Sequence, residues 1–167
     1  MKIGIIGYGK MGRKIERIAQ DRGHEVIARI SSSSGDHEWE LLNEADVCIE
    51  FSNPNSALTN FQHCFENGFP IVTGTTGWYE QIIRTIDGLD GWKLERDDPN
   101  ENELPIEAVR EADVKGTHSV TYDSEVDKIE LKHEAKSRAG FAIGAVLAAE
   151  FLQDKHGFFT MKDLLKA

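Results

Sequence analysis

Long apolar runs are missing from this sequence of 167 residues. No stretch approaches the roughly 20 apolar residues that a helix needs to cross a bilayer, which argues against a membrane-spanning protein. Gly4 and Gly7 interrupt the apolar start of the chain, where a signal peptide would continue its apolar core. These features predict a cytoplasmic protein without a membrane partner.

Cysteines are equally scarce. Cys48 and Cys64 are the only two, they form no Cys-x-x-Cys pair, and no cluster of other ligand residues adjoins them. A disulfide framework or a zinc site would need more cysteines or a recognisable ligand spacing. We therefore predict two buried free thiols and no metal site.

Basic residues are outnumbered by acidic ones, 19 against 29, and the formal net charge is −10. A nucleic-acid-binding protein needs a basic face to neutralise phosphates, so this balance argues against a nucleic-acid partner. The positive charge that exists is concentrated in residues 1–30, where basic residues exceed acidic ones. The start of the chain is therefore suited to hold a small anion.

What the sequence does contain is an alternation of apolar runs with segments of helical periodicity. Strands are expected at residues 2–6, 25–30, 46–51 and 70–73, with helices after the first and third and a short helix at 39–44. This order predicts an α/β fold with a Rossmann-like, doubly wound parallel sheet. The helix after the third strand begins at Ser52-Asn53-Pro54, and its inward face is expected to consist of Ala57, Leu58, Phe61, Cys64 and Phe65.

The pattern changes after the fourth strand. Residues 94–113 are rich in acidic side chains and contain two prolines, as is typical of a solvated connector. Residues 117–122 and 128–133 then alternate in polarity and are predicted to pair as a half-buried antiparallel hairpin. One face would carry Val120, Tyr122, Ile129 and Leu131, with His118 directly opposite His133.

The end of the chain is expected to be helical, with a helix at 141–152 and a capped turn at 160–165. We assign residues 1–93 and 139–167 to a dinucleotide-binding domain. Residues 94–138 form the acidic connector and the hairpin, a reduced substrate or oligomerisation domain. A hairpin without neighbouring strands needs another surface for its apolar side chains, either the nucleotide domain or a second copy of the chain. Of these, a homo-oligomer formed through the hairpin is expected.

The segment Gly7-Tyr8-Gly9-Lys10-Met11-Gly12 fits the pattern G-x-G-x-x-G. The pattern alone is weak, but here it follows a strand and opens a helix. In that setting the first glycine permits the tight turn, the second lets a pyrophosphate approach the backbone, and the third lets helix and strand pack closely. The alternative is a glycine turn that serves packing only.

The end of the second strand bears on the choice between NAD and NADP. An NAD site would place a carboxylate there, whereas this chain has Ser31 after Ile30. A serine hydroxyl donates to a 2′-phosphate, and Arg13 or Arg29 is placed to pair with it. NADP is therefore at least tolerated, unless Ser31 to Ser34 are merely a flexible surface loop.

Several blocks in order make the sequence resemble the dihydrodipicolinate reductase family of the lysine (diaminopimelate) pathway. The blocks are Gly7 to Arg13, Ile49 to Pro54, Val72 to Gly77, and the set His133, Ala135, Ser137, Arg138, Phe141, Ala142, Gly144 and Ala145. The resemblance implies an NAD(P)H-dependent oxidoreductase that delivers hydride to a cyclic, doubly carboxylated, imine-type substrate.

The resemblance also assigns the residues of a cofactor site. Gly7, Gly9, Lys10, Met11 and Gly12 would hold the pyrophosphate, Phe51 and Ser52 would line the cofactor channel, Gly74, Thr75 and Thr76 would lie beside the nicotinamide, and Arg138 and Phe141 would close on the cofactor. Considered one at a time, Phe51 and Phe141 also suit an ordinary core, and Arg138 a surface salt bridge.

The sequence departs from the family in its middle. The family carries a glutamate with two adjacent histidines and a nearby lysine, then Pro-Ser-Gly-Thr-Ala, and this chain has neither motif. The resemblance therefore implies an internal deletion that removed the proton donors and the carboxylate-binding site. Loss of general-acid catalysis alone costs about 10²–10⁴-fold in rate, so we expect little or no reductase activity and assign no catalytic residue.

Two alternatives remain open at this point. The chain suits a non-catalytic NAD(P)-binding module, such as a sensor, a scaffold or an engineered minimal fold. It also suits a different NAD(P)-dependent oxidoreductase with a short substrate lid. In either case the facing His118 and His133 are a proton relay or, more simply, satisfied sheet histidines.

Overall fold

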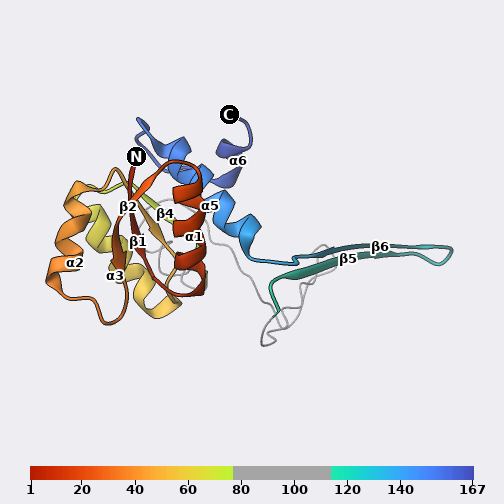
Figure 1. The fold of residues 1–167 in the computed structure, drawn as a ribbon. Coiled ribbons are helices and arrows are strands. Elements are labelled where there is room, and N and C mark those ends of the chain that lie inside the picture. Colours follow the sequence, from red (N-terminus) through yellow and green to blue (C-terminus); the bar gives the residue numbers. More distant parts are fainter. Residues whose placement is uncertain (77–113) are drawn as a thin grey trace. The chain divides into compact units, whose positions relative to one another are not determined.

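The computed structural model describes residues 1–76 and 114–167 (Figure 1). The chain divides into two compact units, Met1–Leu89 with Ala139–Ala167, and Asp90–Arg138. Each unit is described by itself below. The acidic segment 94–113, expected to be a connector, lies outside the described residues.

The first unit is built on a four-stranded parallel sheet, which confirms the predicted α/β class. Its strands are β1 (Lys2–Ile6), β2 (Glu25–Ile30), β3 (Val47–Glu50) and β4 (Ile71–Thr73), in the order β2-β1-β3-β4. The order reverses at β1, because β2 lies on one side of it and β3 on the other. In an open parallel sheet such a switch point is where ligands bind, outside the carboxyl ends of the strands.

The helices follow the strands as expected, with shifted boundaries. They are α1 (Lys10–Asp21), α2 (Asp36–Glu40), the 3-10 helix η1 (Leu41–Glu44), α3 (Pro54–Glu66), α5 (Ala139–Leu152) and α6 (Met161–Leu164). The short helix expected at 39–44 thus begins earlier and changes to 3-10 geometry. The start of α3 is fixed by Asn53, whose side chain accepts from the amides of Asn55 and Ser56 at 3.0 and 3.2 Å. No described helix is long and apolar enough to span a membrane.

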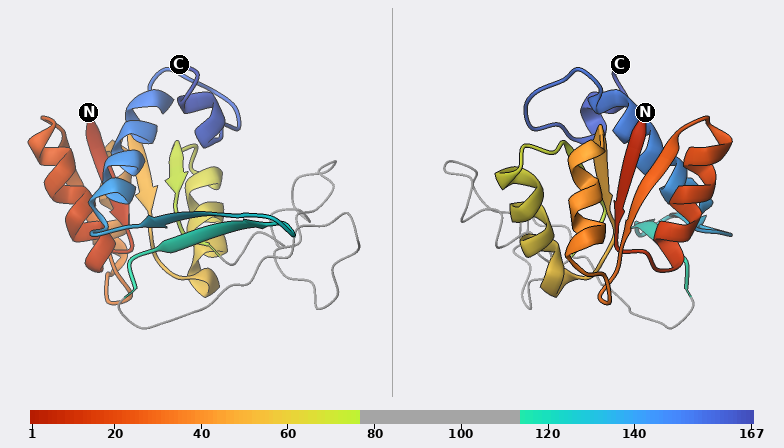
Figure 2. Two further views of the ribbon diagram at one scale, coloured as in Figure 1. Left: turned by 90° about the vertical axis from the view of Figure 1, so that its right-hand side faces the viewer. Right: turned by 60° about the vertical axis from the view of Figure 1, so that its left-hand side comes forward.

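Helices cover both faces of this sheet and enclose two apolar clusters (Figure 2). On one face α1 and α5 pack on side chains that include Ile3, Ile5 and Ile49. On the other, Ile6 joins Leu42 of η1 and Cys64 of α3. Side chains alternate along each strand, so one short apolar run such as β1 supplies both clusters.

One prediction about α3 is wrong. Phe65, expected on the inward face, is 77% exposed, and Asn60 is buried in the stripe with Ala57 and Cys64. Residues 57, 60 and 64 follow helical spacing, and the position after Cys64 turns away from the sheet. Asn60 is accepted in the interior because its amide donates to the hydroxyl of Ser52 at 3.1 Å.

The helix α5 is tied to the end of α1 by a cluster around Glu150. Arg22 donates two hydrogen bonds to this carboxylate, at 2.8 and 2.7 Å, and Nε2 of His24 lies 2.7 Å from it. The hydrogen bonds from Arg22 lower the pKa of Glu150 to about 2. Because Glu150 is near the end of α5, the two helices run parallel, and the first turn of α5 lies at the carboxyl edge of the sheet.

The second unit contains the predicted hairpin, formed by β5 (Thr117–Asp123) and β6 (Lys128–Glu134). Its register pairs His118 with His133 and Val120 with Leu131, as predicted. The expectation of a half-buried hairpin is wrong, since every residue of both strands is exposed. A two-stranded ribbon needs a second layer to bury a face, and the described part of this unit, residues 114–138, holds only these two strands.

Candidate functional site

The candidate site lies at the carboxyl edge of the sheet, where the loop after β1 is held between its neighbours. The amides of Gly7 and Tyr8 both donate to the carbonyl of Ile30 at 2.9 Å, and the amide of Phe51 donates to the carbonyl of Ile6 at 2.8 Å. The loop is thereby fixed to the ends of both β2 and β3. It opens directly into α1, whose N-terminal end carries a partial positive charge.

The three glycines of this loop meet different surroundings. Gly7 has a φ of +95°, and a Cβ there would lie 2.2 Å from the carbonyl oxygen of Phe51. A Cβ at Gly12 would lie 2.5 Å from the carbonyl oxygen of Gly7. A Cβ at Gly9 would meet nothing within 4 Å. Packing therefore requires the first and third glycines, whereas Gly9 leaves open space beside the N-terminus of α1.

The side chains of Lys10 and Arg13 are exposed at this end of α1, and Met11 is half-buried against the apolar cluster under α1. Gly9 precedes the helix and has no side chain with which to cap it. The first amides of α1 thus follow directly on this glycine, without a side-chain cap. This arrangement suits a phosphate group, which brings acceptor oxygens and negative charge to a helix N-terminus.

Glu50 holds together the opposite wall of the site through hydrogen bonds. The sequence pattern did not single out this residue as a functional candidate. Its side chain is 1% exposed at the end of β3. It accepts from the amide of Ser52 at 3.0 Å and from the hydroxyls of Thr73 and Thr75 at 2.7 and 3.0 Å, and the hydroxyl of Ser52 also donates to it. An ionised carboxylate accepts only, so this set of donors matches it. The sequence signal is an acidic residue that ends a buried strand and is followed by serine.

This network uses up the hydroxyl of Ser52. Its oxygen donates to Glu50 and accepts from Ser56 and Asn60 at 3.2 and 3.1 Å, which fills one donor and two acceptor positions. The oxygen of Thr75, in turn, accepts from the amide of Ser52 at 2.9 Å while donating to Glu50. The two predicted site residues are thus joined to each other, and Ser52 contributes to the wall through its backbone and shape.

The predicted residues at the ends of β3 and β4 also touch each other. A Cβ at Gly74 would lie 1.9 Å from Cζ of Phe51, so the aromatic ring packs directly on the glycine. Phe51 also packs against the apolar cluster under α1 and α5. Thr76 is exposed at the end of the segment 1–76, and Phe141 is 47% exposed in the first turn of α5. Arg138 is the last residue of the second unit.

The end of β2 corrects one expectation. Arg29 does not offer an unpaired charge, because its Nε donates to Glu16 of α1 at 2.8 Å and a terminal nitrogen donates to the same oxygen. The hydroxyl of Tyr8 donates to this carboxylate as well. The hydrogen bonds from Arg29 hold the pKa of Glu16 below its ordinary value, and the hydrogen bond to Glu16 raises the pKa of Tyr8. Arg13 lies on the ring of Tyr8, with Cζ 5.9 Å from its centroid.

The serines after β2 form a compact turn. The amide of Ser31 donates to the hydroxyl of Ser34 at 3.0 Å, and the hydroxyls of Ser31 and Ser33 lie 3.0 Å apart. Ser31 is half-buried, and Ser32 and Ser33 are exposed. The turn therefore presents hydroxyl groups, and no carboxylate, where the second strand ends.

Comparison with known proteins places the chain in a family. The family model described as dihydrodipicolinate reductase, C-terminus, matches residues 29–165. A 4-hydroxy-tetrahydrodipicolinate reductase of Christiangramia forsetii is 35% identical over an alignment of 236 positions, which covers 99% of this chain and 98% of that protein. This chain belongs to the dihydrodipicolinate reductase family.

Other members of the dihydrodipicolinate reductase family are more distant. The 4-hydroxy-tetrahydrodipicolinate reductase of Staphylococcus haemolyticus is 25% identical over an alignment of 243 positions, covering 98% of this chain and all of that protein. The enzyme of the same name from Thermosipho africanus is 26% identical over an alignment of 217 positions, covering 99% of this chain and 98% of that protein. The predicted family is thus confirmed over nearly the whole chain.

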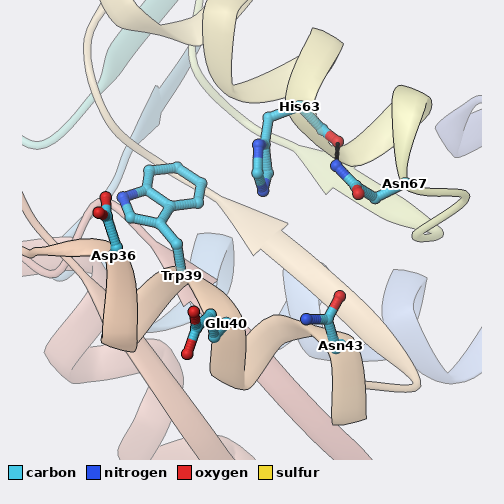
Figure 3. A pocket seen from close by; sticks show the side chains of 6 residues that line it. All are labelled: Asp36, Trp39, Glu40, Asn43, His63 and Asn67. Atoms are coloured by element: carbon cyan, nitrogen blue, oxygen red, sulfur yellow. Dashed lines mark hydrogen bonds between the residues drawn. The ribbon is translucent and has the colours of Figure 1, made fainter.

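In this member of the dihydrodipicolinate reductase family, a cavity lies between α2 with η1 and the end of α3, outside the glycine loop (Figure 3). It measures about 360 Å³ and is lined by Asp36, Trp39, Glu40, Asn43, His63 and Asn67. The indole of Trp39 meets the ring of His63 edge-on at 4.7 Å. None of the predicted site residues lines it.

The two cysteines of this reductase-family chain behave as predicted. Cys48 and Cys64 are both buried and free. A hydrogen bond with the thiol of Cys64, together with burial, raises the pKa of the Cys48 thiol, which keeps it protonated and unreactive. No group of three or more metal-binding side chains occurs within residues 1–76 and 114–167.

Proposed function

We propose that this chain binds a nicotinamide dinucleotide at the carboxyl edge of its parallel sheet, in a dinucleotide-binding domain of residues 1–93 and 139–167. The open space at Gly9 carries the proposal, because no packing contact explains a glycine there. The pyrophosphate would lie on the backbone of Gly7, Gly9, Lys10, Met11 and Gly12, at the N-terminus of α1.

The nicotinamide end of the cofactor would lie along the ends of β3 and β4. Gly74, Thr75 and Thr76 supply small side chains there, and Phe51 and Ser52 form the adjacent wall. Phe141 is exposed at the same edge, in the first turn of α5, and would close on the cofactor together with Arg138. These assignments rest on the resemblance and on the switch point between β1 and β3, where a flat ligand is expected.

We further propose that the site accepts both NADPH and NADH. The turn that begins at Ser31 presents hydroxyls to a 2′-phosphate, and Arg13 is exposed nearby. A Ser31→Asp variant should shift the preference from NADPH toward NADH, because a carboxylate accepts from ribose hydroxyls and repels a 2′-phosphate. The ratio of the two dissociation constants measures this shift, and an unaltered ratio would remove Ser31 from the site.

The relatives are named as reductases, and we propose that this chain is a form of that enzyme with little or no reductase activity. The adjacent histidine pair and the Pro-Ser-Gly-Thr-Ala segment are absent from its sequence. The alignment with the Christiangramia forsetii enzyme spans 236 positions, 69 more than the 167 residues of this chain, which supports an internal deletion. A second candidate, an NAD(P)-binding module without chemistry, is favoured by the same missing motifs.

The deciding experiment is a calorimetric titration of the purified protein with NADPH and NADH, paired with an assay of dihydrodipicolinate-dependent oxidation of the reduced cofactor. We expect binding of both cofactors with turnover at least about 10²-fold below that of a full-length relative. Binding with no turnover would favour the non-catalytic module. Full turnover would overturn the proposed impairment, and absence of binding would overturn the proposed cofactor site.

We also propose that two copies of the chain associate through the apolar face of the hairpin. Val120, Tyr122, Ile129 and Leu131 are 43%, 63%, 57% and 62% exposed in the single chain. A ribbon with four such side chains gains by covering them with an identical surface. Sedimentation velocity should show a dimer or larger oligomer that Leu131→Lys dissociates, with Lys128→Ala as the control. A monomer at all concentrations would contradict the association.

A further inference from the structure

A charged cluster surrounds Tyr8 of the glycine loop. Glu16 accepts from Nε of Arg29 at 2.8 Å and from the hydroxyl of Tyr8. Two guanidinium groups lie near the ring of Tyr8, with Cζ of Arg13 at 5.9 Å and Cζ of Arg29 at 6.0 Å from its centroid. The side chain of Glu16 is 13% exposed and that of Arg29 is 40% exposed. The cluster thus holds two positive charges and one shielded negative charge.

The cluster lies at the end of β2, where the choice between NADP and NAD is made. Arg29 is the penultimate residue of β2, and the loop containing Tyr8 is hydrogen-bonded to the last residue of that strand. In a parallel sheet of this kind the adenosine ribose lies at the end of the second strand. An arginine there pairs with a 2′-phosphate, but Glu16 already holds this one.

We propose that Glu16 is a specificity-determining residue that weakens the preference of this site for NADP by keeping Arg29 paired. This inference rests on the proposed dinucleotide site. Within the cluster, Arg13 is the one cation left unpaired to attract a 2′-phosphate. The carboxylate of Glu16 repels the same phosphate. NADH carries hydroxyls at that position, so its binding is nearly independent of the cluster's charge.

The proposal predicts that substitutions of Glu16 and of Arg29 change the preference for NADPH over NADH in opposite directions. Glu16→Gln raises the net charge of the cluster and releases Arg29 toward the phosphate. Arg29→Met lowers the net charge and leaves Glu16 without a cationic partner. The double variant returns the net charge to that of the natural cluster. Glutamine keeps an oxygen that accepts from the hydroxyl of Tyr8, so the loop contact is retained in the first variant.

The test is calorimetric titration of the full chain and of these three variants with NADPH and with NADH, at one low salt concentration. A charge-assisted hydrogen bond contributes enough to tighten NADPH binding of Glu16→Gln by about tenfold, with NADH binding unchanged within about twofold. Arg29→Met should weaken NADPH selectively, and the double variant should return to the natural ratio. Thermal melting of each variant controls for folding.

The outcomes separate this inference from the proposed function. If the natural chain binds neither dinucleotide, the proposed function fails. If it binds both and Glu16→Gln leaves the NADPH to NADH ratio unchanged or lowers it, only the role of Glu16 is overturned. If NADPH binds the double variant as tightly as it binds Glu16→Gln, the role of Glu16 is also overturned, because Arg29 would then not be the group released toward the phosphate. If Glu16→Gln does not fold, Arg29→Met alone decides, and an unchanged ratio there contradicts the proposal.

Discussion

The parallel sheet and the hairpin differ in whether they bury their apolar side chains. In the sheet, crossover helices cover both faces, and Ile3, Ile5 and Ile49 are fully buried within one chain. In the hairpin, the apolar residues Val120 and Leu131 face each other across two strands that remain exposed. A βαβ unit carries its own second layer, whereas an antiparallel pair joined by a tight turn must find that layer elsewhere. The sheet thus buries its apolar residues within its own unit, whereas the described hairpin does not.

The largest expected effect comes from truncating one apolar residue in each region. Ile49→Ala should lower the free energy of unfolding by about 2–5 kcal/mol, because it removes a fully buried side chain and leaves a cavity. Leu131→Ala in the dilute monomer should change it by no more than about 0.5 kcal/mol, since this side chain is 62% exposed. Urea unfolding measures both. An equal loss for the two variants would show that the hairpin shares the core of the sheet.

The glycine loop belongs to the unit of the parallel sheet, and its proposed role is in binding rather than in burial. Gly9→Asp should weaken dinucleotide binding by roughly 100-fold or more, because its carboxylate would occupy the open space and repel the pyrophosphate. The fold should survive, since a Cβ at Gly9 touches nothing within 4 Å. Titration calorimetry and circular dichroism measure the two quantities, and Gly9→Ala is the matched control for size without charge. Unchanged affinity of Gly9→Asp would contradict the phosphate-loop assignment.

The buried carboxylate at the end of β3 should matter for stability as well as for the site. Glu50→Gln should cost about 1–3 kcal/mol, because an amide nitrogen would face hydroxyl donors that now point to a carboxylate. The wall formed by Ser52 and Thr75 should loosen, which weakens cofactor binding in addition. Glu40→Gln, at an exposed helix position, is the control for loss of charge alone. Equal stability of the two variants would mean that the network around Glu50 is dispensable.

A smaller effect is expected where α5 is tied to α1. The pKa of Glu150 is about 2 in the folded protein, below its ordinary value near 4.5. A lowered folded pKa contributes stability that is present above about pH 4.5 and is lost as the pH falls toward 2. Glu150→Gln should therefore reduce stability at pH 7 by on the order of 1–2 kcal/mol and flatten the pH dependence between 4.5 and 2. Urea unfolding at several pH values measures this, and parallel curves for both proteins would contradict it.

The sequence predicted local elements well where a short pattern determines them. The strand at 25–30 has the predicted bounds, and His118 pairs with His133 as the alternation about the turn required. The loop Gly7 to Gly12 lies between strand and helix, as the motif and its context indicated. Each of these features depends on neighbouring residues, whose periodicity and turn chemistry are visible in the chain.

The errors fall where a distant residue decides the outcome. Phe65 is exposed, and Asn60, which donates to the hydroxyl of Ser52, is buried on the inward face of α3 instead. Arg29 is not free because Glu16, on the preceding helix, pairs with it. In both cases a polar partner on a neighbouring element changes which conformation is favourable, and the periodicity of a single element does not reveal it.

By itself, the sequence determined the α/β class, the family and the place of the glycine loop, because periodicity, glycine spacing and motif order are written along the chain. Only the tertiary structure decided that Glu50 gathers Ser52, Thr73 and Thr75, and that the hairpin buries neither face by itself. These outcomes depend on which side chains meet across strands and helices. Burial and hydrogen bonding between distant residues depend on contacts that exist only in the folded chain.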